Sequence, residues 1–396
     1  MTSHKHRDVI IVGGGICGAM TAYYLRLEGV SVALLDKGRV GQEASWASAG
    51  MVGPESCPQR DPWFLGATTL SKRLYDDLID ELSERTGQRI DYGGGGHLLV
   101  AREEAELEHL HERVAAQSEA DVGAQVLDGM EARAREPALP DDVVAAAWLP
   151  TGRFLDARQF TAVVAAASRQ LGADIHEGWQ VSSLVWDGNG KTVMGVRSGH
   201  DEMHADIVIN AAGAWAGHLD ARLTHPVIPL HGQIMSVSAP PGGLRHNVAR
   251  VGKWGYATPR SDGRVVVGAT HEQWGYQKKI TPTGLAYLSA VVNRVLPCLT
   301  NRPILDVWSG LRPVTIDGLP TVGPDPRVNS GYLWAAGHAS SGIMQTPATA
   351  RVVTDLVLGR QPTLPIDQLS VERYLNNTDL AVVEPLMKLE QRFLSV

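Results

Sequence analysis

The chain has 396 residues, 44% of them apolar, with a mean hydropathy of −0.09 and a formal net charge of −7. This length favours two domains over one small core, and the apolar content is that of a globular protein. The negative charge gives no reason to expect a nucleic-acid partner. The sequence contains no run of 18 apolar residues, so it predicts no transmembrane segment.

The first residues and the cysteines indicate the cellular setting. Residues 1–7 are polar and lead directly into a predicted strand, so we expect no signal peptide. Cys17, Cys57 and Cys298 are widely separated and form no metal-ligand pattern. We therefore expect a cytoplasmic protein without a metal site.

The strongest signal lies at residues 9–19, Val-Ile-Ile-Val-Gly-Gly-Gly-Ile-Cys-Gly-Ala, which predict a strand, a glycine turn and the start of a helix. Gly13 permits the tight turn, Gly15 lets the backbone approach a pyrophosphate, and Gly18 lets the helix pack on the sheet. The free N–H groups at the helix start favour an anion. Asp36 ends the next strand, where its carboxylate can accept hydrogen bonds from ribose hydroxyls. The motif predicts a dinucleotide site and argues against NADP, but it leaves NAD and FAD open.

Residues 41–51 are rich in small side chains and can lie close against a large flat ligand, although a loop with a short helix is the other interpretation. Leucines at positions 70, 74, 78 and 82 predict an amphipathic helix from about 64 to 86. Four glycines at 93–96 then mark the crossing into a second domain, with a strand at 97–100 and a solvent-facing helix at 102–118. A helix at 157–171 suggests a return to the first domain.

The segment 205–215 is a hydrophobic strand that runs into Ala211-Ala212-Gly213, as expected for a buried parallel strand whose end passes close to a cofactor. Residues 227–237 and 264–269 predict strands of an antiparallel sheet. Residues 331–343 repeat the pattern of strand, glycine turn and helix, and this helix continues to about Leu358. Two glycine turns so far apart suit an extended FAD held from both ends of the sequence, which favours FAD over NAD.

On these residues the chain resembles the FAD-dependent amine and D-amino-acid oxidase family, and within it the glycine oxidase branch, from about residue 8 to 373. Besides the first glycine motif, the resemblance is carried by Ser45–Met51, Gly310-Leu311-Arg312-Pro313, Asp317-Gly318-Leu319-Pro320, Ala336-Gly337-His338 and Ser341-Gly342-Ile343. Gly232-Gln233 and Tyr256 with Pro259-Arg260 match strands of the family's substrate domain.

The resemblance implies an α/β fold, with a discontinuous Rossmann-like FAD-binding domain and an α+β substrate domain whose antiparallel sheet covers the flavin. The implied FAD-binding domain comprises 1–90, 150–225 and 305–375; the substrate-binding domain comprises 91–149 and 226–304; a C-terminal helix covers 376–396. FAD is expected to be non-covalent, since no cysteine lies near Val314-Thr315. The residues implied to hold it are Gly13, Gly15, Ile16, Cys17, Gly18, Asp36, Lys37, Ala44, Ser45, Ala49, Gly50, Met51, Val181, Ala212, Gly213, Gly337, His338, Ser340, Ser341, Gly342, Ile343 and Met344.

The resemblance also implies the substrate site. Arg312 matches the arginine that binds the substrate carboxylate, for which a planar fork gives two parallel hydrogen bonds; a structural ion pair is the other interpretation. Tyr256 matches a tyrosine that donates to the same carboxylate, although it could be a core aromatic. Trp254 stands where glycine oxidases carry a histidine, and Ser340 where they carry a second arginine. These two departures leave the substrate open within the family.

The resulting hypothesis is oxidation of a small amino acid or secondary amine of the glycine, sarcosine or D-amino-acid type. A hydride leaves Cα for flavin N5, the imine is hydrolysed to an oxo acid, and molecular oxygen reoxidises the flavin with formation of hydrogen peroxide. The alternatives are a dehydrogenase of the same fold that passes electrons to a quinone or partner subunit, a non-catalytic flavin-binding subunit, and an NAD-dependent dehydrogenase. The sequence leaves monomer and homo-oligomer both open.

Overall fold

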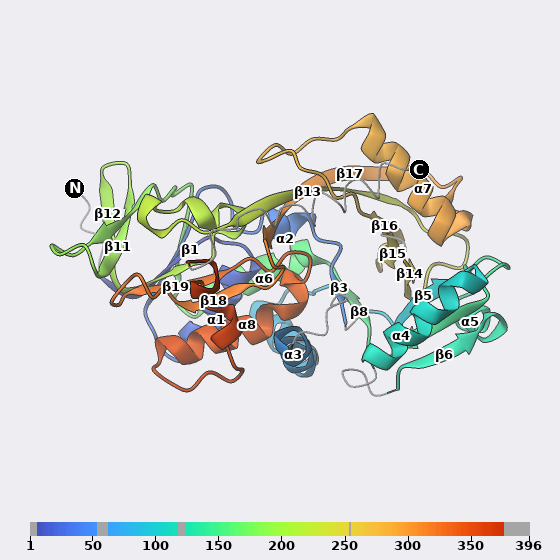
Figure 1. Ribbon diagram of the computed structural model, residues 1–396, viewed down its shortest axis with the longest axis horizontal. Helices are drawn as coiled ribbons and strands as arrows, with labels where there is room; N and C mark the ends of the chain where they lie inside the picture. Colours follow the sequence, from blue (N-terminus) through green and yellow to red (C-terminus); the bar gives the residue numbers. More distant parts are fainter. Residues whose placement is uncertain (1–5, 54–61, 118–122, 253–254, 376–396) are drawn as a thin grey trace.

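Two large sheets organise the chain and lie toward opposite ends of the molecule (Figure 1). The computed structural model describes residues 6–53, 62–117, 123–252 and 255–375. The mixed α/β fold expected from the sequence is confirmed. The predicted helix at 376–396 lies outside the described residues, as does Cys57.

The first sheet has a parallel core in the order β9–β2–β1–β12–β19. These strands are β1 (Arg7–Val12), β2 (Val32–Asp36), β9 (Asp174–Glu177), β12 (Asp201–Asn210) and β19 (Tyr332–Ala336). Antiparallel strands extend it at β10 (Ser183–Trp186), β11 (Val193–Ser198) and β18 (Thr321–Pro324). The sheet is therefore assembled from three stretches that are far apart in the sequence.

Both faces of this sheet are covered, one of them by helices, which explains why residues 9–12 of β1 are hydrophobic without interruption. Val9 and Ile11 pack with α1 (Ile16–Leu27), the start of α3 (Pro62–Thr86) and α8 (Gly342–Val357). Ile10 and Val12 face the other side, where the β10–β11 hairpin and the 3₁₀ turns η3 (Gly213–His218) and η4 (Ala221–Leu223) pack. Helix α6 (Ala157–Gln170) packs against α1 and α3. The chain's described part ends with η6 (Asp367–Leu369) and α9 (Glu372–Leu375).

The second sheet has the order β17–β13–β16–β15–β14–β5–β7–β6, and its neighbours are antiparallel except β14 and β5. In that order the strands are β17 (Ile304–Thr315), β13 (Val227–Ser238), β16 (Arg264–Gly268), β15 (Tyr256–Pro259), β14 (Asn247–Arg250), β5 (His97–Ala101), β7 (Ala145–Leu149) and β6 (Gln125–Asp128). One face is covered by α5 (Gly129–Arg135) and α7 (Pro282–Val295). The other face bears α4 (Leu107–Gln117) at one end and the loop that contains α2 (Ala44–Ala47) at the other.

Smaller elements join the two sheets. Strands β3 (Met51–Val52), β8 (Arg153–Leu155) and β4 (Tyr92–Gly93) form a short sheet between them. The 3₁₀ turn η2 (Glu104–Glu106) precedes α4, and η5 (Pro297–Leu299) follows α7. None of the helices within the described ranges is both long enough and apolar enough to cross a membrane.

Most predicted elements are present, including helices at 62–86 and 157–170 and a second glycine turn between β19 and α8. One expected boundary differs from the sheet pairing. Residues 305–315, assigned from the sequence to the FAD-binding domain, belong to β17, which pairs with β13 from Val227 to Val237. Near its end β17 also forms an isolated bridge between Val314 and His338, which lies in the second glycine turn. The division into domains itself stays a prediction.

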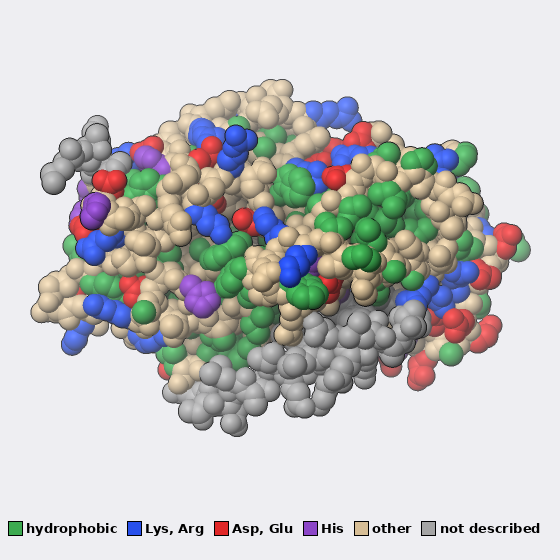
Figure 2. All heavy atoms as spheres, turned by 90° about the horizontal axis from the view of Figure 1, so that it is seen from above, with side chains coloured by type: hydrophobic (Ala, Val, Ile, Leu, Met, Phe, Trp, Pro, Cys, Tyr) green, Lys and Arg blue, Asp and Glu red, His purple; other side chains and the backbone are tan. Residues whose placement is uncertain are grey.

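The surface seen from the side of β13, β17 and α7 is mixed in charge (Figure 2). Basic and acidic side chains alternate across it, and apolar side chains gather in the half where α7 lies (Figure 2). Such a mixture gives this face no strong single-sign field to attract a polyanion.

Candidate active site

A cavity of about 870 Å³ connects the two glycine turns with the second sheet. It is lined by the ends of β1, β2, β12 and β19 on one side and by residues of β13, β15 and β17 on the other. The carboxyl ends of parallel strands are where α/β sheets bind their ligands. The fold therefore places the sequence motifs on the walls of one site.

The first glycine turn is shaped by close approaches of the backbone. A Cβ atom at Gly13 would lie 2.3 Å from the carbonyl oxygen of Ala211, and the φ of Gly13 is +108°. A Cβ atom at Gly18 would lie 2.0 Å from the carbonyl oxygen of Gly13. A Cβ at Gly15 would meet only Ser45 Oγ, at 3.4 Å, so this glycine faces the cavity. The sequence motif thus combines two packing glycines with one that opens the site.

The start of α1 offers N–H groups to an anion. Gly15 is the N-cap and forms no side-chain cap, while the Ile16 N–H donates to Ser45 Oγ at 2.9 Å. A helix N-terminus without an acidic cap carries a partial positive charge that favours phosphate.

The other end of the motif carries Asp36 and Lys37. Asp36 accepts hydrogen bonds from the N–H groups of Gly14 and Gly38, both at 2.7 Å. Burial raises the pKa of Asp36, and these two bonds oppose that effect. Lys37 Nζ lies 3.1 Å from the centroid of the Trp215 ring, a cation–π contact. Asp36 and Lys37 both line the cavity, and Lys37 lies against an aromatic ring.

Side chains behind the small-residue loop hold its carbonyl groups. Arg158 Nε donates to the Trp46 carbonyl and Trp308 Nε1 to the Ala47 carbonyl, each at 3.1 Å. Arg260 is buried and donates to the Ala49 carbonyl. These donors come from α6, β17 and the turn after β15, so three distant segments fix this loop against the cavity.

Arg312 on β17 is the central cation of the cavity. A Cβ at Gly232, on the neighbouring strand β13, would lie 2.1 Å from Arg312 Nη1, so glycine is needed there to make room for the guanidinium. Arg312 Nη1 donates to the Thr270 carbonyl at 3.2 Å, and burial lowers the pKa of Arg312. In the described part of the chain no carboxylate forms an ion pair with it. A buried cation of this kind is suited to an anionic ligand.

Tyr256 lies close to Arg312. Its ring stands over Gly268 of β16, where a Cβ would lie 2.3 Å from the hydroxyl oxygen. Burial raises the pKa of Tyr256, and the Arg312 charge partly opposes this, so the hydroxyl stays protonated at neutral pH. It can therefore donate a hydrogen bond into the cavity.

Comparison with known proteins decides the family. A model of the FAD dependent oxidoreductase family matches residues 8–356. The chain belongs to this family. It is therefore a FAD-dependent oxidoreductase, and its cofactor is FAD rather than NAD.

Individual relatives are similar over most of the chain. Glycine oxidase from Geobacillus kaustophilus (strain HTA426) is 32% identical over 377 residues, which are 94% of this chain and 98% of that protein. The crystal structure of glycine oxidase from Geobacillus kaustophilus gives a TM-score of 0.86 at 30% identity, with 92% and 98% of the two chains covered. The structure of iminodiacetate oxidase from Chelativorans sp. BNC1 gives a TM-score of 0.82 at 27% identity, with 91% and 98% covered.

A longer relative is similar in only part of its length. The bifunctional protein ThiO/ThiG from Synechocystis sp. is 32% identical over 381 residues, which are 95% of this chain but 55% of that protein. The chain thus spans about half of this relative.

The residues present fit FAD. The cavity volume of about 870 Å³ suits a large ligand, Gly15 leaves space before the uncapped start of α1, and Asp36 lies at the opposite end of the motif. Cys17 also lines the cavity, but burial raises the pKa of its thiol to about 12. A protonated thiol is a poor nucleophile, which supports the prediction that FAD is held without a covalent bond.

Nearly all residues predicted to hold FAD lie together on the cavity wall. They are Gly13, Gly15, Ile16, Cys17, Asp36, Lys37, Ala44, Ser45, Ala49, Gly50, Met51, Val181, Ala212, Gly213, Gly337, His338, Ser340, Gly342 and Ile343. Gly18, Ser341 and Met344 are buried behind this wall. Arg312 and Tyr256 line the same cavity, and Trp254 lies outside the described residues. The role of each residue stays a prediction.

Sequence reasoning missed His271, which lines the cavity beside Arg312. Burial, together with the Arg312 charge, lowers the pKa of His271 to about 3, so its imidazole is neutral at neutral pH. Its only sequence signal is its place just after a predicted strand. Arg158 and Arg260 were also not assigned a role, because their partners are backbone carbonyls distant in sequence.

Several other histidines are buried and neutral, which makes folding sensitive to acid. Burial lowers the pKa of His97 and His225 to about 3 and that of His338 to about 4. Below the unfolded value of about 6.5, only the unfolded chain takes up these protons. The free energy of unfolding should therefore decrease as the pH is lowered. The decrease should be up to about 1.4 kcal/mol per histidine for each pH unit between 6.5 and the pKa of that histidine in the folded protein.

Urea denaturation of the apoprotein between pH 7.5 and 4.5 measures this slope. His225→Gln should reduce the slope, because glutamine can keep a hydrogen bond to Thr321 without titrating. His200→Gln, in an exposed turn, is the matched control and should leave the slope unchanged. An unfolding free energy that does not change over this pH range would contradict the assignment of buried neutral histidines.

Proposed function

We propose that the protein oxidises a small amino acid or carboxylated secondary amine to an imine, which hydrolyses to the oxo acid. The observation that carries this proposal is Arg312, buried in the same cavity as both nucleotide-binding turns and without an ion-pair partner in the described residues. FAD, when bound, supplies the two-electron acceptor, and we propose molecular oxygen as the final oxidant, giving hydrogen peroxide.

Arg312 and Tyr256 would hold the substrate by its carboxylate. The guanidinium fork matches the two carboxylate oxygens, and the Tyr256 hydroxyl adds a third donor. Three fixed donors set the position and the plane of the carboxylate, so the Cα end of the substrate is placed in the cavity before reaction. The role of this pair is to bind and orient.

The chain's own residues also set the charge and the solvent content of the site. The second sheet covers the cavity with the backbone of Gly232 and Gly310 and the side chain of Ile234, which limits the space for water. The neutral His271 adds no positive charge beside Arg312. A substrate amine that binds uncharged needs no strong base, and we assign none.

The test is anaerobic mixing of the FAD-loaded protein with a panel of amines while the visible flavin absorbance is followed. Glycine, sarcosine, D-alanine and D-proline should include compounds that bleach the flavin, whereas methylamine and dimethylamine, which lack the carboxylate, should not. If no carboxylated amine bleaches the flavin of the chain alone, the proposal is wrong and the protein is a flavin-binding subunit without its own turnover.

A second measurement separates an oxidase from a dehydrogenase. With a bleaching substrate in air, an oxidase consumes oxygen and releases an equal amount of hydrogen peroxide. Rapid dye reduction with little peroxide would instead indicate that electrons pass to a quinone or a partner subunit.

Tyr256→Phe should raise the KM for the carboxylated amine about tenfold, because one hydrogen bond to a charged group is lost. The change in kcat should be smaller, since the hydroxyl contacts the carboxylate and not the reacting bond. Steady-state kinetics on the FAD-loaded variant measures both constants. An unchanged KM would instead identify Tyr256 as a core aromatic.

A further inference from the structure

The loop between β16 and α7 contains a segment that reaches from the second sheet toward the half of the molecule where β12 lies (Figure 1). We call residues 272–280 of this loop the strap. Its first residue is half-buried, and residues 273–280 are exposed. None of the nine is among the described residues that line the cavity. The strap therefore lies outside the cavity wall and is not itself part of the ligand-binding surface.

The base of the strap is fixed to β13 by buried groups. The main chains of His231 and Glu272 exchange two hydrogen bonds of 2.9 Å, and the Lys279 N–H donates to His231 Nε2 at 3.1 Å. The Gln233 amide donates to Glu272 Oε1 at 2.8 Å and to Thr281 Oγ1 at 3.0 Å, so it joins the two ends of the strap. Because His231 and Gln233 are fully buried, this base is firmly held.

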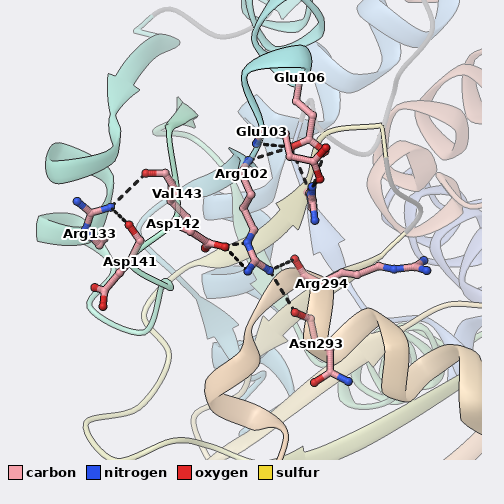
Figure 3. A network of polar contacts seen from close by, with 10 residues as sticks. Arg102, Glu103, Glu106, Arg133, Asp141, Asp142, Val143, Asn293 and Arg294 are labelled. Atoms are coloured by element: carbon pink, nitrogen blue, oxygen red, sulfur yellow. Dashed lines mark hydrogen bonds and ion pairs between the residues drawn. The ribbon is translucent and has the colours of Figure 1, made fainter.

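Helix α7, which follows the strap, is fixed at both ends. The Thr281 side chain caps its first turn. At its other end Arg102 donates to the carbonyl groups of Asn293 and Arg294, at 3.1 and 3.0 Å (Figure 3). Arg102 is itself held by Asp142, to which its Nε donates at 2.8 Å (Figure 3). Movement in this region is therefore confined to the strap.

The tip of the strap contacts the nucleotide side of the cavity, which is the side lined by the ends of β1, β2, β12 and β19. The Tyr276 hydroxyl donates to the Ala214 carbonyl at 3.0 Å, and the Tyr276 ring stacks on Trp215 with the centroids 5.4 Å apart. Lys278 Nζ lies 2.9 Å from Glu43 Oε2. Ala214, Trp215 and Glu43 all line the cavity. The tip thus joins the second sheet to two separate parts of the cavity wall, η3 and the loop after β2.

The contacts of the tip are weaker than those of the base. The side chains of Lys278 and Glu43 are 42% and 36% exposed, and an ion pair so open to solvent adds little stability. Tyr276 is 39% exposed, and it adds one aromatic stack and one hydrogen bond. The tip can therefore detach while the base stays in place on β13.

We propose that the strap is a gate for FAD. Its tip detaches from η3 and Glu43 to let the cofactor enter or leave, and it reattaches to close the cavity. This inference rests on FAD as the cofactor and is independent of the proposed substrate. Tyr276 and Lys278 contact the wall from outside, so removing them removes no contact to the ligand. A looser tip lowers the barrier to entry and to exit alike, and the equilibrium affinity is unchanged.

The test is the kinetics of FAD exchange by the full chain. Tyr276→Ala should raise the association and the dissociation rate constants about tenfold each, because an aromatic stack and a hydrogen bond are lost. Lys278→Ala, which loses an exposed ion pair, should raise both about two- to threefold. Quenching of flavin fluorescence on rapid mixing with the apoprotein measures association. Transfer of FAD to an excess of a second apoflavoenzyme measures dissociation, and equilibrium titration should give an unchanged Kd.

The strap offers a matched control for each variant. Trp274→Ala is the control for Tyr276→Ala, since Trp274 is 43% exposed and its Nε1 donates to Glu272 within the strap at 2.6 Å. Lys279→Ala is the control for Lys278→Ala, since Lys279 Nζ lies over the Trp274 ring, 4.6 Å from its centroid. Both control side chains contact the strap itself. Both control variants should therefore exchange FAD at the rates of the wild type.

Three results would overturn the gate. The first is that Tyr276→Ala and Lys278→Ala leave both rate constants unchanged. The second is faster dissociation with unchanged association and a weaker Kd, which would mean that the tip only supports the residues that bind FAD. The third is an equal acceleration in the control variants, which would mean a general loosening of the loop. Thermal melting of each apoprotein establishes that it is folded.

These measurements separate the gate from the proposed function, because they need only the apoprotein and FAD. Flavin reduction by a carboxylated amine, together with unchanged FAD exchange in the tip variants, would refute the gate alone. Faster exchange in these variants, without flavin reduction by any amine, would support the gate and refute the oxidation.

Discussion

Replacing Arg312 with alanine is expected to raise the KM for a carboxylated amine by about 30-fold or more. Truncating one partner of a buried, hydrogen-bonded charge pair costs about 2–5 kcal/mol, and each 1.4 kcal/mol is about a factor of ten. Arg312→Lys keeps the charge but loses the planar fork, so its KM should lie between those of the wild type and the alanine variant. Steady-state kinetics on FAD-loaded protein measures all three.

Stability provides the control for this prediction. Arg312 is buried, donates one hydrogen bond to the Thr270 carbonyl, and forms no ion pair with a carboxylate in the described segments. Removing such a cation should leave the free energy of unfolding of the apoprotein unchanged or higher. If Arg312→Ala instead lowers the stability by several kcal/mol and leaves the KM unchanged, the arginine has a structural role.

The nucleotide half of the site was predictable because its signals are contiguous. Gly13, Gly15, Gly18 and Asp36 fall within one βαβ unit, and each answers a local need for a turn, a close approach or an acceptor. The second glycine turn was predictable for the same reason, and its separation from the first pointed to FAD. Local patterns of this kind predict the local structure well, because that structure depends little on the rest of the chain.

The substrate half was predictable only as single residues. Arg312 and Tyr256 were named from resemblance, but the space for Arg312 depends on Gly232, and the ring of Tyr256 depends on Gly268. These neighbours arise from the pairing of β13 with β17 and of β15 with β16. Cross-strand pairing over such distances leaves no periodic signal in the sequence.

The position of α4 was missed for a similar reason. His109 and Arg113 were assigned from the sequence to a solvent-facing helix without chemistry. In the structure, α4 packs over β5, β6 and β7, and its Leu110 is buried against Val251, which follows β14. The residues of a charged helix, considered alone, predict that the helix faces solvent. Its position over the cavity depends on which strands pair beneath it.

Two alanine substitutions in the first glycine turn should affect different properties, one the binding of FAD and the other the stability of the fold. Gly15→Ala is expected to weaken FAD binding by about 10- to 100-fold, because a methyl group at the helix start blocks backbone N–H bonds to phosphate. The φ of Gly15 is −68°, which alanine adopts readily, and the added Cβ meets only Ser45 Oγ. The apoprotein should therefore keep its stability or gain about 0.5 kcal/mol.

Gly18→Ala should act on folding instead. Its Cβ would lie 2.0 Å from the Gly13 carbonyl oxygen and 3.2 Å from Ile11 Cγ2, so α1 must move away from β1. Such overpacking costs about 3 kcal/mol, and urea denaturation of the apoprotein should detect it. Fluorescence titration with FAD, on protein confirmed as folded, measures the FAD affinity of each variant. If both variants lose stability and affinity together, the turn acts as one packing unit; separate losses mean that Gly15 serves the ligand and Gly18 the fold.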